Sequence, residues 1–174
     1  MIITYSVAYG TGALHLPRNE MLGAVLIGSV AMIPALMGFA ALSDKWGRYR
    51  LFLSGAALSG LWAFAFFALL NTGSFIAIAV AVSVGLILLA LMYGPQAALF
   101  AELFSPEIRY SGASIGYQIG AVLGGGFAPI ISTALYAEFG SSLAVAFYMA
   151  AMCIISLLCT ILLDQRQARN GATS

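Results

Sequence analysis

Six tyrosine and glutamine side chains lie at helical spacing within apolar stretches of this sequence. Tyr5 and Tyr9 are four residues apart, and Tyr93 and Gln96 are three apart, so each pair shares one face of a helix. Phenol and amide groups can hydrogen-bond to a small polar molecule, and an amide among apolar residues needs such a partner. The candidates for lining a path for such a molecule are Tyr5, Tyr9, Tyr93, Gln96, Tyr117 and Gln118. Tyrosines also anchor helices at bilayer surfaces or pack between them, so the two glutamines are the stronger signal.

Two clusters of opposite charges interrupt the apolar sequence. The first follows Ser43, and the second is an acid and an arginine seven residues apart. Carboxylates beside cations at helix junctions can pair across helices, and so hold one end of a bundle closed in one state and release it in another. The predicted network comprises Asp44, Lys45, Gly47, Arg48, Arg50, Glu102 and Arg109. The alternative is a pair of solvated loops, whose exposed ion pairs contribute only about 0 to 1 kcal/mol each.

Enzyme and metal chemistry find little support. Gly112 to Gly116 matches the G-x-S-x-G pattern of serine hydrolases, but the only histidine, His15, is predicted on the opposite side of the protein from Ser114. Cys153 and Cys159 are six residues apart on one predicted helix and point in different directions, so we expect neither a disulfide nor a metal site. We predict no catalytic residues and no metal.

The composition places these residues in a bilayer. The 174 residues are 62% hydrophobic and 7% charged, with a mean hydropathy of +1.01, whereas soluble domains carry about a quarter charged residues. A net charge of +1 provides no basic excess for binding nucleic acid. No acid lies inside a predicted membrane span, because Glu102 and Glu138 both fall at span ends, so this chain offers no obvious buried proton carrier.

The spacing of charges and turns predicts an all-α membrane protein with six transmembrane helices. A span needs about 20 residues, so the first helix is short by its first turns; a signal peptide there is disfavoured because no basic residue precedes it. The expected helices cover residues 1–14, 21–42, 51–70, 75–103, 111–136 and 142–163. They form one bundle over residues 1–165, and a polar, disordered tail over 166–174 follows.

Alternating loops predict the orientation. Six passes place loops 43–50 and 105–110 and the C-terminus on one side, together with six of the seven Lys and Arg residues. By the positive-inside rule that side is cytoplasmic.

Glycine recurs every fourth residue on the fifth predicted helix, at Gly112, Gly116, Gly120 and Gly124. Such a stripe lets another backbone approach closely, either in static packing or as a surface against which a second bundle rocks. Pro129 and the three consecutive glycines from 124 predict a bend.

The charged segments resemble those of the major facilitator superfamily. Residues 44–50 are similar to its D-[RK]-x-G-R-[RK]-[RK] loop, with Tyr49 where a base is common and Ala40 where glycine often precedes it. Glu102 to Arg109 resembles the E-x6-R loop of sugar-porter types. The run from Arg109 to Pro129 resembles the metabolite:proton symporter branch, which includes shikimate, α-ketoglutarate and proline/betaine transporters.

The resemblance implies that residues 1–165 are the C-terminal six helices of a twelve-helix transporter in a bacterial inner membrane. It implies alternating access and symport of a small organic acid or zwitterion, with no cofactor and the proton as coupling ion. The first and fourth helices would line the cavity, the second and fifth would contact the missing N-terminal half, and the third and sixth would face lipid. The chain alone is then expected to be inactive.

Two alternatives to the C-terminal half of a longer transporter remain open. One is a half-length transporter that acts as a dimer through the glycine face, and the other is a structural or regulatory six-helix membrane protein. The last alternative predicts that changing Asp44 or Arg48 has no effect on any uptake.

Overall fold

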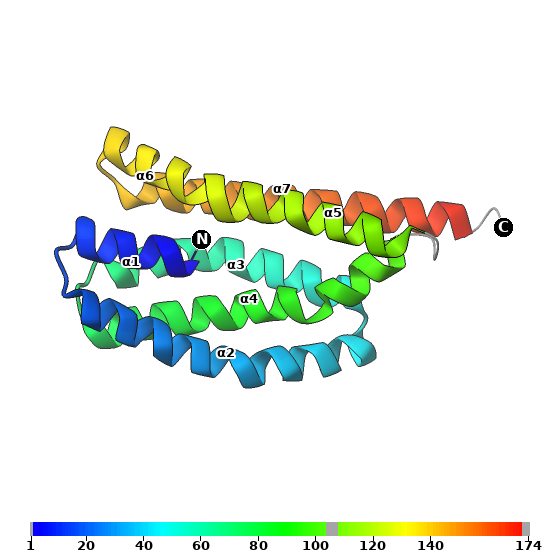
Figure 1. Ribbon diagram of the computed structural model, residues 1–174, viewed down its shortest axis with the longest axis horizontal. Helices are drawn as coiled ribbons and strands as arrows, with labels where there is room; N and C mark the ends of the chain where they lie inside the picture. Colours follow the sequence, from blue (N-terminus) through cyan, green and yellow to red (C-terminus); the bar gives the residue numbers. More distant parts are fainter. Residues whose placement is uncertain (1, 104–107, 172–174) are drawn as a thin grey trace.

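The structure is a computed structural model that describes residues 2–103 and 108–171, and the side chains of residues 2–100 and 108–165. Helices make up the described fold and run nearly parallel along one long axis (Figure 1). In chain order they are α1 (Ile2–Gly12), α2 (Arg18–Trp46), α3 (Arg48–Leu70), α4 (Phe75–Leu103), α5 (Arg109–Ala121), α6 (Ala128–Phe139) and α7 (Ser142–Gly171). A π-helical turn, Val122–Phe127, joins α5 to α6 into one rod.

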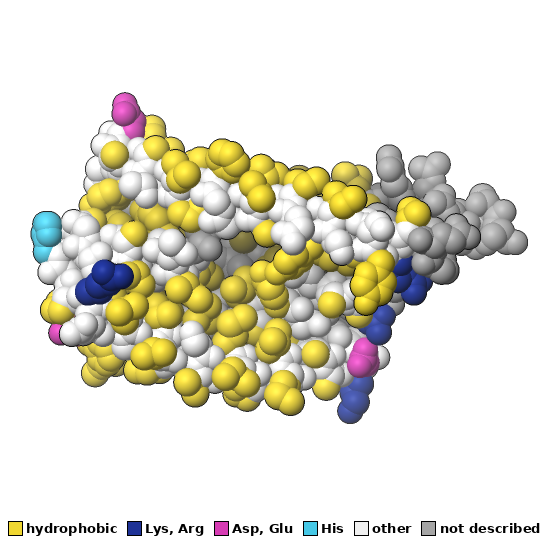
Figure 2. Space-filling model, in the orientation of Figure 1, with side chains coloured by type: hydrophobic (Ala, Val, Ile, Leu, Met, Phe, Trp, Pro, Cys, Tyr) yellow, Lys and Arg dark blue, Asp and Glu magenta, His cyan; other side chains and the backbone are white. Residues whose placement is uncertain are grey.

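When α5, the π-helical turn and α6 are taken as one continuous helix, five described helices are long and apolar enough to cross a membrane. Their spans are Arg18–Trp46, Arg48–Leu70, Phe75–Phe100, Arg109–Phe139 and Ser142–Gln165. The 11 residues of α1 cover only about 16 Å, less than the hydrocarbon thickness. Charged side chains gather at the two ends of the molecule and hydrophobic ones cover its middle (Figure 2). The predicted all-α membrane fold is confirmed.

Glycines and prolines set the helix ends. Gly47 has a φ of 91°, a left-handed conformation that ends α2, and α3 begins at the next residue. Gly140, with a φ of 61°, ends α6 and bonds back to the carbonyl of Tyr136. Pro17 precedes α2 and supplies the extended residue before its first turn.

Four of the predicted helices extend beyond their expected limits, whereas α4 has the bounds expected for it and α1 ends at Gly12, two residues early. The loop expected at 43–50 is helical apart from Gly47, and the tail expected to be disordered continues α7 as far as Gly171. Near Pro129, where the sequence predicts a bend, the structure has the π-helical turn Val122–Phe127. Hydropathy shows where a chain enters the bilayer, but helical hydrogen bonding can continue through polar residues outside it. A helix can therefore be longer than the apolar interval that it contains.

The bundle has a buried side and an open side. Helix α4 packs against α2 and α3, and α3 also packs against α7. A Cβ placed on Gly94 would lie 2.9 Å from the backbone nitrogen of Ala40, so α2 and α4 cross almost backbone to backbone. By contrast α5 has no buried residue, and α2 exposes Leu26, Val30 and Met37 to between 66% and 71%. The second and fifth passes therefore present the open side, where the resemblance would place the other half.

Candidate functional site

A cavity of about 380 Å³ lies between α4 on one side and α5 with the π-helical turn on the other. Tyr93 and Gln96 project from α4, and Tyr117 faces them from α5. Tyr93 and Tyr117 keep 45% and 46% of their surfaces exposed. Three of the six path candidates thus meet in one place, from two helices that are separate in sequence.

Glycines form the opposing wall of this cavity. Gly116 and Gly120 from α5, and Gly124 and Gly125 from the π-helical turn, line it together with Ala121. A Cβ on any of these four glycines would meet no atom within 4 Å. The cavity therefore owes part of its volume to missing side chains, and the residues described in its lining carry no formal charge.

Tyr5 and Tyr9 lie elsewhere, in a buried aromatic cluster. Their rings stack at 5.8 Å, and Tyr136 from α6 meets Tyr9 edge-on at 5.1 Å. Only 4% and 6% of their surfaces are exposed, although they border a second cavity of about 250 Å³. Gln118 is exposed and borders neither cavity. The structure therefore does not bring these three candidates to Tyr93 and Gln96.

A hydrogen-bonded relay that the sequence analysis missed ties Tyr9 into the fold. The Tyr9 hydroxyl donates to Oδ1 of Asn71 at 2.7 Å, and Nδ2 of Asn71 donates to the Ser142 hydroxyl at 2.9 Å. Asn71 stands in the turn between α3 and α4, so this single side chain links α1 to the start of α7. The available signal was its position, because it is the first strongly polar residue after the third apolar stretch.

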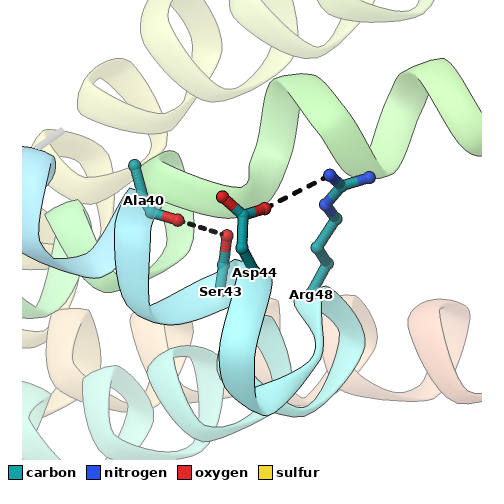
Figure 3. A network of polar contacts seen from close by, with 4 residues as sticks. All are labelled: Ala40, Ser43, Asp44 and Arg48. Carbon is teal, nitrogen blue, oxygen red and sulfur yellow. Dashed lines mark hydrogen bonds and ion pairs between the residues drawn. The ribbon is translucent and has the colours of Figure 1, made fainter.

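The predicted charged network lies at the opposite end of the molecule. Asp44 lies in the last turn of α2 and Arg48 begins α3, and an ion pair of 3.3 Å joins them across Gly47 (Figure 3). Asp44 is more exposed than Arg48, at 67% against 33% of the side chain, so the pair is worth at most about 1 kcal/mol. Ser43 beside it is buried and donates to the carbonyl of Ala40 at 2.7 Å.

A groove of about 780 Å³ surrounds this ion pair. Residues 43–50, including Lys45 and Arg50, line it together with Asp164 from α7. Asp164 was not among the predicted network residues, although loop alternation already placed it at this end. Arg109 is exposed and does not border the groove, and the side chain of Glu102 lies outside the described residues. The structure therefore assembles the first charged cluster with an unforeseen acid from α7.

Several proteins of known description are similar to this chain in sequence. The chain is 34% identical over 170 residues to the shikimate transporter of Escherichia coli, covering 96% of this chain and 39% of that protein. It is 38% identical over 164 residues to the inner membrane metabolite transport protein YhjE of the same organism, covering 92% and 36%. A protein of Staphylococcus aureus described as a proline/betaine transporter is 27% identical over 158 residues, covering 91% and 34%.

The chain spans less than two fifths of the length of these relatives. No solved structure matches it significantly. The family profile described as Major Facilitator Superfamily matches residues 1–173, nearly the whole chain. This match agrees with the apolar helices and the charged helix junctions described above. The chain therefore belongs to the Major Facilitator Superfamily of membrane transporters.

Proposed function

We propose that this chain is the C-terminal half of a proton-coupled symporter for a small organic acid or zwitterion. The observation that carries the proposal is the cavity in which Tyr93, Gln96 and Tyr117 meet beside a glycine wall, within a protein whose relatives are metabolite transporters. Its lining can hydrogen-bond and stack against a small molecule, but the described part carries no cation to bind a carboxylate. The other half would supply that charge and the proton carrier.

Alternating access would then involve both ends of the molecule. The groove around Asp44, Arg48 and Asp164 would close the cytoplasmic end in one state and open in another. The open side formed by α2 and α5 would contact the N-terminal half, as the exposed residues of both helices allow. The chain alone is expected not to transport.

The first measurement is the DNA sequence upstream of Met1. We expect the reading frame to continue through six further hydrophobic segments, and we call the product of that whole frame the complete transporter. Purified in proteoliposomes, it should accumulate labelled shikimate, proline or glycine betaine when a proton gradient is imposed, and a protonophore should abolish the uptake.

The matched control is the 174-residue chain reconstituted at the same density. Uptake by this chain alone that a protonophore abolishes would contradict the proposal. Such a result, with a disulfide crosslink between two copies of a Gly116→Cys variant, would favour a half-length transporter that acts as a dimer. An uptake rate of the complete transporter that is unchanged by Asp44→Asn would count against the charged groove as a gate.

A further inference from the structure

The π-helical turn Val122–Phe127 interrupts the ordinary hydrogen bonding of a membrane-spanning helix. The N–H of Ala128 bonds to the carbonyl of Leu123, five residues earlier, instead of to Gly124, four residues earlier. Pro129, the residue that would serve Gly124 in a continued π-helix, has no N–H to donate. The carbonyl of Gly124 is therefore left without its α-helical or its π-helical partner.

This carbonyl is deep in the membrane. Gly124 is midway along the span Arg109–Phe139, about 22 Å from either end. Water cannot reach backbone groups at that depth through lipid, so irregular backbone is tolerated there only against protein or along a cavity. Gly124 does line a cavity, the one that also contains Tyr93 and Gln96.

The surroundings leave the Gly124 backbone accessible. Gly124 is exposed, and a Cβ on Gly120, Gly124 or Gly125 would meet no atom within 4 Å, so no described side chain lies directly against the Cα of these glycines. π-Helical turns inside α-helices are frequent at functional sites, where they expose backbone groups that a regular helix would use internally. The Gly124 carbonyl, without a regular helical partner and on a residue that lines the cavity, is therefore available to a donor on a molecule that occupies the cavity.

We propose that the Gly124 carbonyl accepts a hydrogen bond from an O–H or N–H group of the transported molecule. This inference rests on the proposed transport function and narrows its substrate class. A carbonyl cannot bind a carboxylate, and a fully methylated ammonium has no N–H to donate. The cavity would then select hydroxylated acids or amines that retain an N–H over analogues of similar size and charge without a donor.

The test uses the purified complete transporter in detergent and the ligand-dependent shift of its thermal unfolding midpoint, because a ligand that binds the folded state raises that midpoint. One ligand pair is proline and N,N-dimethylproline, which differ in N–H donors. The other is shikimate and cyclohexene carboxylate, which differ in hydroxyl groups. We expect the donor-bearing member of at least one pair to bind about tenfold more tightly, the effect of one hydrogen bond. The pair that shows the difference identifies the donor as N–H or O–H.

Pro129→Ala supplies the control on the carbonyl itself. Alanine restores an N–H and permits a regular helix, so Gly124 would regain a partner and the preference for donor-bearing ligands should disappear. Pro34→Ala, in α2 and away from the cavity, should keep the preference.

Equal binding within both pairs, a preference that survives in Pro129→Ala, or no shift with any ligand would each overturn the inference. Those results would leave the proposed function standing if the complete transporter still shows protonophore-sensitive uptake. If protonophore-sensitive uptake is absent but the preference for donor-bearing ligands is intact, the proposed function fails and the assignment of the Gly124 carbonyl stands.

Discussion

Gln96 and Gln118 have the same side chain and occupy very different positions. Gln96 borders the cavity with Tyr93 and Tyr117, whereas Gln118 is exposed on the neighbouring helix. Because adjacent residues on a helix are rotated by about 100°, Tyr117 can face the cavity while Gln118 turns away. Residue type alone does not tell which of the two glutamines lines the cavity, whereas the direction that each takes from its helix does.

We expect Gln96→Leu to reduce kcat/KM for uptake by the complete transporter about 10- to 100-fold. The substitution keeps the volume near constant but removes a group that can hydrogen-bond to a bound molecule, which is worth about 1 to 3 kcal/mol when the partner is left unpaired. The measurement is initial uptake into proteoliposomes. Gln118→Leu is the matched control and should stay within about twofold. Equal losses in both variants would contradict the assignment of Gln96 to the cavity.

Asn71 offers a second contrast at the residue scale. Its amide accepts from Tyr9 and donates to Ser142, whereas the neighbouring Thr72 bonds only to nearby groups in its own turn. We expect Asn71→Ala to lower the free energy of unfolding by about 1 to 2 kcal/mol, since the buried Tyr9 hydroxyl loses its acceptor. Unfolding in detergent micelles measures this, and Thr72→Ala should change it by less than about 0.5 kcal/mol. The reverse order would show that the relay contributes nothing to stability.

At the scale of elements, the packing of α2 on α4 depends on glycine at one crossing. A Cβ on Gly94 would approach backbone atoms of Phe39 and Ala40, which cannot rotate away as a side chain could. Gly38 lies in α2, close in sequence to Phe39 and Ala40, but a Cβ on Gly38 would meet nothing within 4 Å. The same residue type therefore permits close approach at one site and leaves open space at the other.

We expect Gly94→Ala to destabilise the chain by about 1 to 3 kcal/mol, because the two helices must separate to admit the methyl group. Gly38→Ala should be neutral, or stabilising by up to about 1 kcal/mol, because alanine favours a helix over glycine. Thermal unfolding of the purified chain compares the two. A Gly94→Ala variant as stable as Gly38→Ala would show that the crossing has room to spare.

Over the whole molecule, the connections divide between two ends. The α1–α2, α3–α4 and α6–α7 connections lie at one end, and the α2–α3 break lies at the other, with the C-terminal end of α7 (Figure 1). The structure thus shows the alternation that the loop charges predict. Which end faces the cytoplasm stays a prediction of the positive-inside rule. Membership of a transporter family confirms that the chain is not an enzyme.

The orientation can be tested with single cysteines after Cys153 and Cys159 are replaced by alanine. We expect a membrane-impermeant maleimide to label Thr72→Cys in intact cells, and Trp46→Cys only after the membrane is disrupted, because both residues are exposed at opposite ends. Labelling of Trp46→Cys in intact cells, with Thr72→Cys protected, would reverse the orientation.

The sequence by itself determined the class of protein, the six apolar stretches and the end at which most cations gather. These are properties of each segment alone: a stretch of about 20 apolar residues must satisfy its backbone internally, and charges must remain outside the hydrocarbon. The charged motif around Asp44 and Arg48 could also be recognised from the sequence, because the two residues are only four positions apart. The family could therefore be anticipated from local patterns.

Only the tertiary structure decided which polar groups share a site. It placed Tyr93, Gln96 and Tyr117 around one cavity, and buried Tyr5 and Tyr9 in another cluster. It also revealed the roles of Asn71 and Asp164, which depend on contacts between distant segments. The rotation of each helix about its axis follows from packing against its neighbours, and the apolar composition of these helices, which provides no strong polar face, leaves that rotation unspecified.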